Sequence, residues 1–184
     1  MNFEEKLLDS KRIYTGKIIN VEEETVQLPD GKNAKREIVR HHGGAVALLC
    51  ITADDKMIFV KQWREPLRKT TLEVPAGKIE PAEEQSPEET AKRELNEEVR
   101  LRAERLEQIA VFYTSPGFAD EKMFLYHAQG LSPVAQALPQ DDDEFLNVYE
   151  LTLAEAQEQI KAGLICDSKT IMAVWYWMLK LRSV

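Results

Sequence analysis

The chain has 184 residues, of which 43% are hydrophobic and 30% are charged, a composition typical of a single folded domain with a sizeable core. Its formal net charge of −8 argues against nucleic acid as the main partner, but it is compatible with an anionic small substrate if arginine, lysine or a metal supplies positive charge locally. No apolar run approaches the roughly 18 residues that cross a bilayer, and the stretch MNFEEKLLDSKR lacks the apolar segment of a secretion signal.

The two cysteines, Cys50 and Cys166, lie in apolar stretches without the spacing of metal ligands. We expect both to be buried thiols in a reducing compartment, which indicates a cytoplasmic protein. The histidines, His41, His42 and His127, also lack ligand spacing and are expected to be structural. No internal repeat, low-complexity tract or long linker interrupts the chain.

The first 42 residues are rich in strand signals. Residues 12–28 have the partial alternation of strands, PDGK at 29–32 is a turn signal, and AKREIVRH at 34–41 follows as another strand. We therefore expect a small N-terminal antiparallel sheet in residues 1–42 and a main domain in residues 43–184.

The middle of the chain alternates strands with one helix. Residues 43–52, GGAVALLCIT, form the continuous apolar run of a strand buried on both faces. A turn leads to a strand at 57–63, and a short strand at 70–77 ends at a glycine. A helix begins after Ser86, because serine followed by proline and then by Glu89 is a capping pattern.

The C-terminal part adds strands first and helices last. The expected elements are a strand and loop at 106–117, a strand at 122–131, an acidic loop at 138–145, a strand at 146–151, and helices at 152–163 and 167–181. The sum is an α+β fold, with one helix midway along the chain and two at the end.

The middle helix carries an unusual cluster of acids, because AKRELNEEVR at 91–100 brings Glu94, Glu97 and Glu98 together. A helix turns about 100° per residue, so the three carboxylates share one face and border the apolar stripe of Leu95 and Val99. Beside that stripe, the carboxylates would lie in the crease where the helix meets its neighbouring element. Carboxylates in such a crease would bind a hard cation, Mg²⁺ or Mn²⁺. The alternative interpretation is a solvated acidic face.

The segment GKIEPAEEQSPEETAKRELNEE, residues 77–98, resembles the Nudix box, a glycine-led loop and helix that ends in R-E-U-x-E-E with U aliphatic. The residues that match this ending are Arg93, Glu94, Leu95, Glu97 and Glu98. The resemblance implies an α/β/α sandwich with a mixed central sheet. It also implies that Glu94, Glu97 and Glu98 hold Mg²⁺ on a pyrophosphate, with the backbone carbonyl of Ala76 as a further ligand.

The chain departs from the box in two places. The family glutamate six residues after the glycine falls on Glu83, whereas counting back from Arg93 places it at Gln85, so the loop carries two extra residues and Glu83, Glu84 or neither takes that role. Arg100 replaces the glycine that usually ends the helix in the left-handed conformation, at a cost of about 1 kcal/mol.

Four further stretches resemble the ADP-ribose pyrophosphatase branch of the family: KREIVRHHGGAVALL, VKQWREPLRKTTLEVPAGKIEP, FYTSPGFADE and DEF. Pro116 resembles a hallmark proline of that branch. The resemblance implies Mg²⁺-dependent hydrolysis of ADP-ribose to AMP and ribose 5-phosphate, by a homodimer whose N-terminal strands help to build the partner's substrate site. The alternatives are hydrolysis of another nucleoside diphosphate sugar, and a nucleotide-binding Nudix protein that no longer catalyses.

The branch usually takes its general base from an acidic loop near the C-terminal end of the domain. Here QDDDEF supplies Asp141, Asp142, Asp143 and Glu144. Asp141, Asp143 and Glu144 are the candidates, and a solvated acidic turn is the alternative.

Several residues match positions that bind substrate in the branch. Arg64, in QWREP, matches a phosphate contact, and Arg36 or Arg40 is expected to be another, because arginine offers phosphate a pair of donors. Surface salt bridges are the alternative for all three. SPGFADE resembles a loop that touches the terminal ribose, so Ser115 and Glu121 are expected to bond its hydroxyls.

Adenine needs an apolar or aromatic shelf, for which Tyr14 is a candidate. The tryptophans, Trp63, Trp175 and Trp177, are expected to lie in the core or at an interface.

Overall fold

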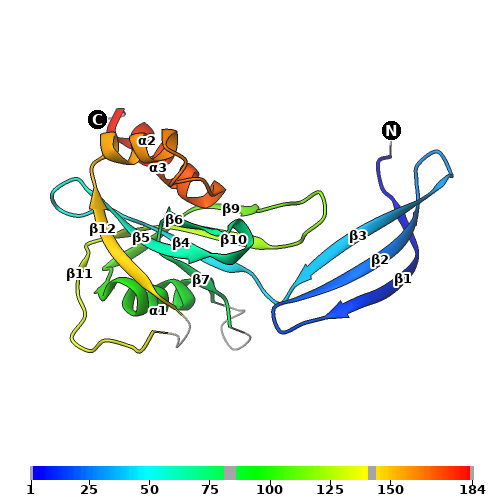
Figure 1. Ribbon diagram of the computed structural model, residues 1–184, viewed down its shortest axis with the longest axis horizontal. Helices are drawn as coiled ribbons and strands as arrows, with labels where there is room; N and C mark the ends of the chain where they lie inside the picture. The colour runs from blue at the N-terminus through cyan, green and yellow to red at the C-terminus, as the bar shows by residue number, and fades with distance from the viewer. Residues whose placement is uncertain (1, 81–85, 141–143, 183–184) are drawn as a thin grey trace.

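The computed structural model describes residues 2–80, 86–140 and 144–182. A three-stranded antiparallel sheet at the N-terminus stands out from a larger domain, in which helices cover two further sheets (Figure 1). The fold is α+β, as the sequence predicted.

The N-terminal sheet consists of β1 (Lys6–Thr15), β2 (Ile19–Gln27) and β3 (Asn33–His41), in that spatial order. Its antiparallel pairing confirms the predicted arrangement. The first strand begins at Lys6, earlier than residue 12, where the sequence pattern placed it. All residues of β1 are exposed, so this strand lacks the alternation of buried and exposed positions that reveals a half-buried strand.

The larger domain is built on two sheets, one with the order β7-β4-β10-β9 and one with the order β12-β5-β6. Their strands are β4 (Ala45–Cys50), β5 (Met57–Arg64), β6 (Lys69–Glu73), β7 (Ala76–Lys78), β9 (Arg105–Tyr113), β10 (Lys122–Gln129) and β12 (Leu146–Leu151). The first sheet is mixed, because β10 runs parallel to β4 whereas the other neighbours are antiparallel. The remaining elements are η1 (Glu65–Leu67), α1 (Pro87–Val99), β8 (Leu101–Arg102), β11 (Ser132–Pro133), α2 (Leu153–Lys161) and α3 (Ser168–Arg182).

Strand β4 lies in the centre of the core, and all of its residues are buried. Successive side chains point to opposite faces of a strand. Leu49 packs in one cluster with Phe59 and with Trp177 of α3, whereas Leu48 packs in the other cluster with Leu95 of α1. Helices therefore cover both faces, and the α/β/α sandwich is confirmed (Figure 1). In the described parts of the chain, the helices lack the length and apolarity that crossing a bilayer requires.

The single strand predicted at 70–77 was wrong, because the chain forms two strands there. Strand β6 ends at Glu73, and β7 begins at Ala76 in the other sheet. Pro75 lies between them and has no N–H to donate to a ladder. Its carbonyl accepts a hydrogen bond from the Leu48 N–H of β4 at 2.8 Å, which carries the chain across to the first sheet.

The cysteines and tryptophans divide between core and surface. Cys50 is buried but Cys166 is exposed, so the prediction of two buried thiols was wrong for Cys166. It lies one position after a buried isoleucine, in the segment between α2 and α3, where its side chain faces outward. Trp177 is in the core at 1% exposure, whereas Trp63 and Trp175 are each 56% exposed, and an interface role for those two stays a prediction.

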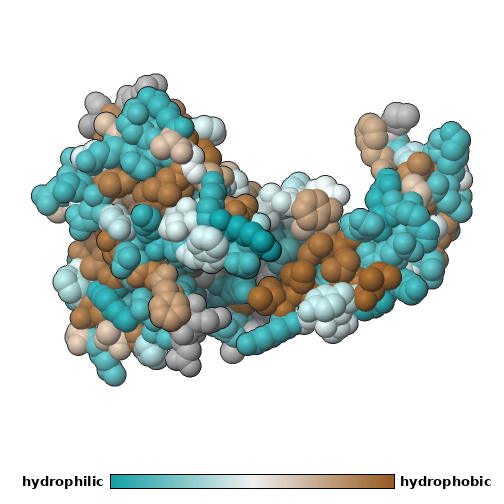
Figure 2. All heavy atoms as spheres, viewed as in Figure 1, coloured by the Kyte–Doolittle hydropathy of each residue, from teal (hydrophilic) through white to brown (hydrophobic). Residues whose placement is uncertain are grey.

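Apolar side chains gather on the N-terminal sheet near its junction with the larger domain (Figure 2). Ile13 and Tyr14, at the junction end of β1, are each more than half exposed. Ile13 also lines a hollow of about 470 Å³ with Val39 of β3 and with Phe118. A contiguous apolar surface of this kind is typical of an interaction site.

Helix α1 ends at Val99 and is capped by Arg100 in the left-handed conformation, with φ of 59°. This is the conformation that the family's glycine would adopt, so the replacement leaves the helix end in place. The Arg100 N–H donates to the Asn96 carbonyl at 3.1 Å, and its side chain donates to the carbonyls of Asn96 and Leu138. These bonds offset part of the roughly 1 kcal/mol that a side chain costs there.

The C-terminal segment closes the outer edge of β6. The Leu72 N–H donates to the Leu164 carbonyl at 3.0 Å, and the Val74 N–H donates to Thr170 Oγ1 at 3.0 Å. An edge strand otherwise presents unpaired backbone groups to solvent. The start of α3 is therefore fixed against the strand that leads into the box.

A buried ion network lies at the same edge and centres on Glu73, which is 2% exposed. Its carboxylate accepts two hydrogen bonds from Arg64, at 2.8 and 2.7 Å, one from Thr71 at 2.7 Å and one from Lys169 of α3. Burial raises the pKa of Glu73, but the hydrogen bonds and charges of Arg64 and Lys169 outweigh burial and bring it to about 2. The network joins β5, β6 and α3 through one side chain.

We expect the stability of the fold to depend on the charge of Glu73 in acid. The folded pKa of about 2 lies below the ordinary value of 4.5, so its contribution is present above about pH 4.5 and is lost as the pH falls towards 2. The difference corresponds to roughly 3 kcal/mol. Urea unfolding of the wild type between about pH 6 and 3 should show this decline, and Glu73→Gln should flatten it.

Asp54→Asn removes an exposed acid and serves as the control, whose pH dependence should follow the wild type. A Glu73→Gln variant that loses stability in acid as steeply as the wild type would contradict the assignment.

Candidate active site

Helix α1 carries the acids that the sequence singled out. Ser86 caps the helix, because its Oγ accepts a hydrogen bond from the Glu89 N–H at 3.4 Å. The buried face contains Leu95 together with Glu94 and Glu98, which are 6% and 2% exposed. These two carboxylates therefore lie inside the crease beside the apolar stripe, and the alternative of a solvated acidic face does not hold for them.

Strand β7 forms the other wall of the crease. The Ala76 N–H donates to Glu98 Oε2 at 3.0 Å. Gly77 contacts the carboxyl of Glu94 so closely that a Cβ at this position would lie 1.8 Å from Glu94 Oε1. The position admits no side chain while Glu94 stays in place, which is a steric reason for the glycine that opens the box.

The environment of the two acids disfavours their charged forms. Burial raises the pKa of Glu94 to about 7, with the neighbouring charges of Glu97 and Glu144 acting in the same direction against the guanidinium of Arg93. Burial, followed by the charges of Glu144 and Glu94, raises the pKa of Glu98 well above its usual range. Buried carboxylates that repel each other need positive charge nearby.

Arg93 provides one positive charge at the mouth of the crease. Its Nη1 lies 2.8 Å from Glu94 Oε1 and 2.6 Å from Glu97 Oε2, and its Nη2 donates to the Lys78 carbonyl at 3.1 Å. Arg93 thus holds Glu97 beside Glu94, and Glu97 is more exposed than its two neighbours.

The residues of the crease fit a hard divalent cation. Glu98 Oε1 is buried and has no hydrogen-bond partner among the described residues, which leaves a carboxylate oxygen for a cation to pair with. Glu94, Glu98 and Ala76 offer oxygen, the ligand type that Mg²⁺ takes. Within residues 2–80, 86–140 and 144–182, no single ion position is surrounded by three or more acidic, histidine or cysteine side chains. Two carboxylates are in the crease, and the third is held by Arg93.

The acidic loop reaches the crease through Glu144, whose charge acts on both Glu94 and Glu98. The other candidates for the general base, Asp141 and Asp143, lie outside the described residues, as does Asp142. Glu83, Glu84 and Gln85, in the box loop that is predicted to carry two extra residues, also lie outside them.

The three candidate phosphate-binding arginines occupy two different regions. Arg64 is bonded to Glu73 on β6, in the larger domain. Arg36 and Arg40 lie on β3 of the N-terminal sheet, which stands away from α1 (Figure 1). Arg36 forms two hydrogen bonds with Glu5. Within one chain, the fold therefore brings Arg64 towards the acids and leaves Arg36 and Arg40 on the N-terminal sheet.

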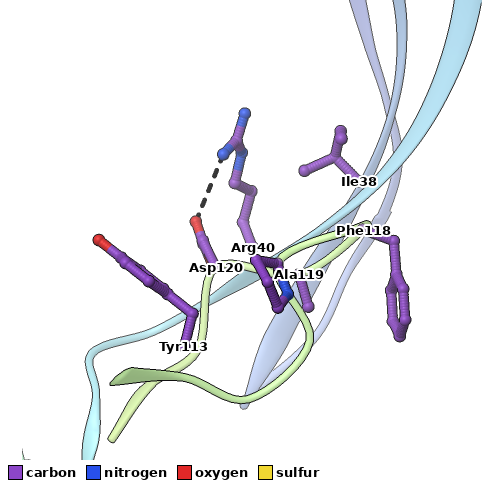
Figure 3. A pocket seen from close by; sticks show the side chains of 7 residues that line it. Ile38, Arg40, Tyr113, Phe118, Ala119 and Asp120 are labelled. Carbon is purple, nitrogen blue, oxygen red and sulfur yellow. Dashed lines mark hydrogen bonds and ion pairs between the residues drawn. The ribbon is translucent and has the colours of Figure 1, made fainter. Parts of the chain in front are cut away.

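Arg40 belongs to an ion cluster at the junction of the sheet and the domain. Its guanidinium donates to Glu22 at 3.1 Å, to Glu24 at 2.9 Å and to Asp120 at 3.4 Å. Asp120 also accepts a hydrogen bond from the His41 N–H at 2.7 Å. Figure 3 shows the guanidinium reaching the Asp120 carboxylate beside a pocket of about 260 Å³. The pocket is lined by Ile38, Arg40, Tyr113, Pro116, Phe118, Ala119 and Asp120.

The loop that resembles the ribose contact lies at this pocket. The Ser115 carbonyl accepts hydrogen bonds from the N–H groups of Phe118 and Ala119, at 3.1 and 2.9 Å, and Glu121 accepts one from the Thr114 hydroxyl at 2.7 Å. The Phe118 carbonyl accepts from the Val39 N–H of β3 at 2.7 Å. The loop is therefore joined to the N-terminal sheet.

Sequence reasoning missed Asp120, Glu73 and Lys169. Glu73 and Lys169 are separated by 96 positions, and a contact at that distance leaves no periodic signal in the sequence. Asp120 lies within a quoted motif, SPGFADE, so its motif was found but its partner on β3 was not.

Two features define the class of this protein. It is a sandwich built on a mixed sheet, and the buried acids of α1 lie against β7, the strand that contains Gly77. Residues 41–171 match the NUDIX domain, so the chain belongs to the Nudix hydrolase family. Residues 5–39, which contain β1, β2 and most of β3, match the nucleoside diphosphate sugar hydrolase N-terminal domain.

Within that family the chain is a homologue of ADP-ribose pyrophosphatase. It is 46% identical to the ADP-ribose pyrophosphatase of Bacillus subtilis (strain 168) over 179 residues, which cover 97% of this chain and 95% of that protein. It is 47% identical over 178 residues to the methanol dehydrogenase activator of Bacillus methanolicus, with the same coverage of 97% and 95%. The crystal structure of an ADP compounds hydrolase has a TM-score of 0.87 and covers 100% of this chain and 97% of that one. At 23% identity this likeness concerns the fold.

We expect Gly77→Ala to disturb the crease without disturbing the core. The new methyl group would lie 1.8 Å from Glu94 Oε1, so the Glu94 carboxylate must move. Altering a residue that positions a metal ligand, as Gly77 does for Glu94, typically weakens metal binding by about 10- to 100-fold, and titration with Mn²⁺ followed by electron paramagnetic resonance should show this loss.

Gly117→Ala is the matched control, because a Cβ there meets nothing within 4 Å. Equal Mn²⁺ affinity in the Gly77→Ala variant and the wild type would show that Glu94 is not part of a cation site.

Proposed function

We propose that the chain hydrolyses the pyrophosphate bond of ADP-ribose, giving AMP and ribose 5-phosphate, with Mg²⁺ as cofactor and Mn²⁺ as a substitute. The observation that carries the proposal is the buried Glu94 and Glu98 pair in a Nudix box, with one carboxylate oxygen of Glu98 left without a partner among the described residues. The identity of 46% to an ADP-ribose pyrophosphatase over nearly the full length supports the choice of substrate.

Four residues would hold the cation: Glu94, Glu97, Glu98 and the backbone carbonyl of Ala76. When bound, Mg²⁺ neutralises pyrophosphate oxygens and lowers the pKa of a water molecule. Glu94 and Glu98 already lie in the crease, whereas Glu97 would have to give up its ion pair with Arg93 in order to bind the cation. The exchange leaves Arg93 beside the incoming phosphates, where a guanidinium is a suitable partner.

The general base comes from the acidic loop between β11 and β12. Glu144 is the described candidate, since its charge already acts on Glu94 and Glu98. Asp141 and Asp143 are the other two candidates. A base in this loop would take the proton from the attacking water.

Substrate binding involves both parts of the chain. Arg64 would contact a phosphate from the larger domain. Arg36, Arg40, Ser115 and Glu121 belong to the N-terminal sheet and to the loop joined to it, and they would bind the phosphates and the terminal ribose. Because that sheet stands away from α1 of its own chain (Figure 1), these residues would serve the crease of a second copy.

We further propose a homodimer in which residues 1–42 complete the partner's substrate site. The exposed apolar side chains of β1 and the hollow lined by Ile13, Val39 and Phe118 support it, because a second copy would remove this surface from water. The arrangement gives the N-terminal sheet two roles, in association and in substrate binding.

A substrate panel tests the activity. Purified protein with Mg²⁺ is offered ADP-ribose, other nucleoside diphosphate sugars and dinucleotides, and AMP release is measured. ADP-ribose should be much the best substrate. Glu97→Gln should lower turnover by on the order of 100-fold or more, because it removes a carboxylate from the cation, and thermal melting should stay as in the wild type.

Glu88→Gln, an exposed acid on the same helix, is the control and should keep full turnover. Faster cleavage of another sugar nucleotide would move the substrate assignment to that compound. Binding without cleavage would identify a non-catalytic protein, and near wild-type turnover of Glu97→Gln would remove Glu97 from the site.

Light scattering after gel filtration tests the homodimer. The wild type should have the mass of two chains, and Ile13→Asp should shift it towards one chain with a loss of activity, since a charge would be buried in the interface. Asn33→Asp, an exposed position near the β2–β3 turn, should remain dimeric. A wild type that is fully active with the mass of one chain would overturn the proposal.

A further inference from the structure

The candidate phosphate-binding residue Arg64 does not stand alone, because its position is set by a chain of contacts that begins on α3. Arg64 holds Glu73 through two parallel hydrogen bonds, Nε to Oε1 and Nη2 to Oε2. A guanidinium has five N–H donors in a rigid plane. The edge formed by Nε and Nη2 faces Glu73, so the remaining donors on Nη1 and Nη2 point away from it.

The outer edge of Arg64 lies on the same side of the sheet as the acids of α1. Arg64 of β5 shares its face with Val60, which packs against Leu95 of α1. Glu73 is paired with Val60 across the two strands and points to that face as well. The charge of Glu98 contributes to raising the pKa of Arg64, after the larger effect of the hydrogen bond with Glu73. Arg64 is therefore within electrostatic reach of the crease.

The Glu73 carboxylate is itself held in place by further contacts besides those with Arg64. Each of its oxygens accepts two hydrogen bonds: Oε1 from Arg64 and Thr71, and Oε2 from Arg64 and Lys169. A carboxylate has about four acceptor positions, so the four bonds fix its plane. Without Lys169, the hydrogen bond from the Thr71 hydroxyl is the remaining contact of Glu73 among the described side chains that opposes movement of the Arg64 and Glu73 pair as a unit.

Lys169 is built into the fold at this place. It is 8% exposed, and its ammonium also donates to Asp167 Oδ1 at 2.9 Å. Asp167 accepts the Thr170 N–H at 3.0 Å, and Thr170 Oγ1 accepts the N–H of Val74, the residue after β6, at 3.0 Å. The start of α3 is thus anchored on the strand that carries Glu73. Two acids and two bases, Asp167, Glu73, Lys169 and Arg64, balance each other in charge.

We propose that Lys169 is a positioning residue for the hydrolytic reaction: it holds Glu73 in one plane, and Glu73 aims the outer edge of Arg64 at the substrate phosphates. The proposal rests on the proposed function, because it needs Arg64 to contact the substrate. Lys169 itself touches neither substrate nor cation.

Steady-state kinetics with ADP-ribose and Mg²⁺ give the first test. Lys169→Met removes the charge and keeps the length of the side chain. We expect KM to rise by about tenfold while kcat changes less than about threefold, since phosphate binding is weakened and the crease is intact. Lys169→Arg keeps a charged donor and should restore most of the affinity.

Lys69→Met is the matched control. Lys69 also ties β6 to the C-terminal part, through its hydrogen bond to the Gly163 carbonyl at 3.0 Å, but this bond does not involve Glu73. Its KM should stay within about twofold of the wild type. An equal rise of KM in both lysine variants would show that Lys169 acts through general stability.

A double-mutant cycle tests whether the effect passes through Arg64. In an Arg64→Ala background, Lys169→Met should change KM by less than about twofold, because the group that it positions is absent. A tenfold effect in both backgrounds would overturn the proposal.

A measurement without substrate separates this proposal from the proposed function. The Arg64 Nε–H, assigned in ¹⁵N spectra by its loss in Arg64→Ala, should exchange with solvent slowly in the wild type and in Lys69→Met, and about tenfold faster in Lys169→Met. Unchanged exchange would refute the positioning role even if ADP-ribose is cleaved. Faster exchange in a protein that cleaves no substrate would refute the proposed function and leave the contact chain established.

Asp167→Asn replaces Lys169→Met if the Lys169→Met variant does not fold. This substitution loosens the second contact that holds Lys169, and the same direction of change is expected.

Discussion

The burial of two like charges in one crease is the constraint on which the site depends. Glu94 and Glu98 are almost wholly removed from water, and burial of a carboxylate is unfavourable unless positive charge or hydrogen bonds compensate it. Strand β7 contributes one N–H and a glycine that leaves room for the Glu94 carboxyl, and Arg93 contributes one charge. The compensation is incomplete within the described chain, and this shortfall is what makes a divalent cation the natural partner of the crease.

A second, balanced set of charges lies on the same side of the sheet. Glu73 is buried like the α1 acids, yet its pKa moves in the opposite direction, since Arg64 and Lys169 supply two cations to one carboxylate. The contrast explains how a chain of net charge −8 can handle an anionic substrate. Negative charge is concentrated where a cation would bind, and guanidinium groups are held on rigid strands where phosphates would lie.

In the proposed homodimer, the N-terminal sheet would serve both substrate binding and association of the two copies. Arg36 and Arg40 are placed on β3, away from the helix whose acids they would assist, and the 115–121 loop is hydrogen-bonded to that strand. In the proposed homodimer, the crease of a second copy would complete this pocket. Two relatives of nearly equal identity, 46% and 47%, carry the names of a pyrophosphatase and of a dehydrogenase activator, so identity alone does not choose the physiological role.

The sequence by itself determined the α+β class, the capped helix, the acids on one face and the family, because these depend on residues close together in the chain. It misplaced the break at Pro75 and the exposure of Cys166, and it left open which acid of 141–144 meets the crease. The tertiary structure decided the partners: Glu73 with Lys169, Arg40 with Asp120, and β7 with α1. Such contacts join residues far apart in the chain, and their energies depend on burial and geometry that no local pattern encodes.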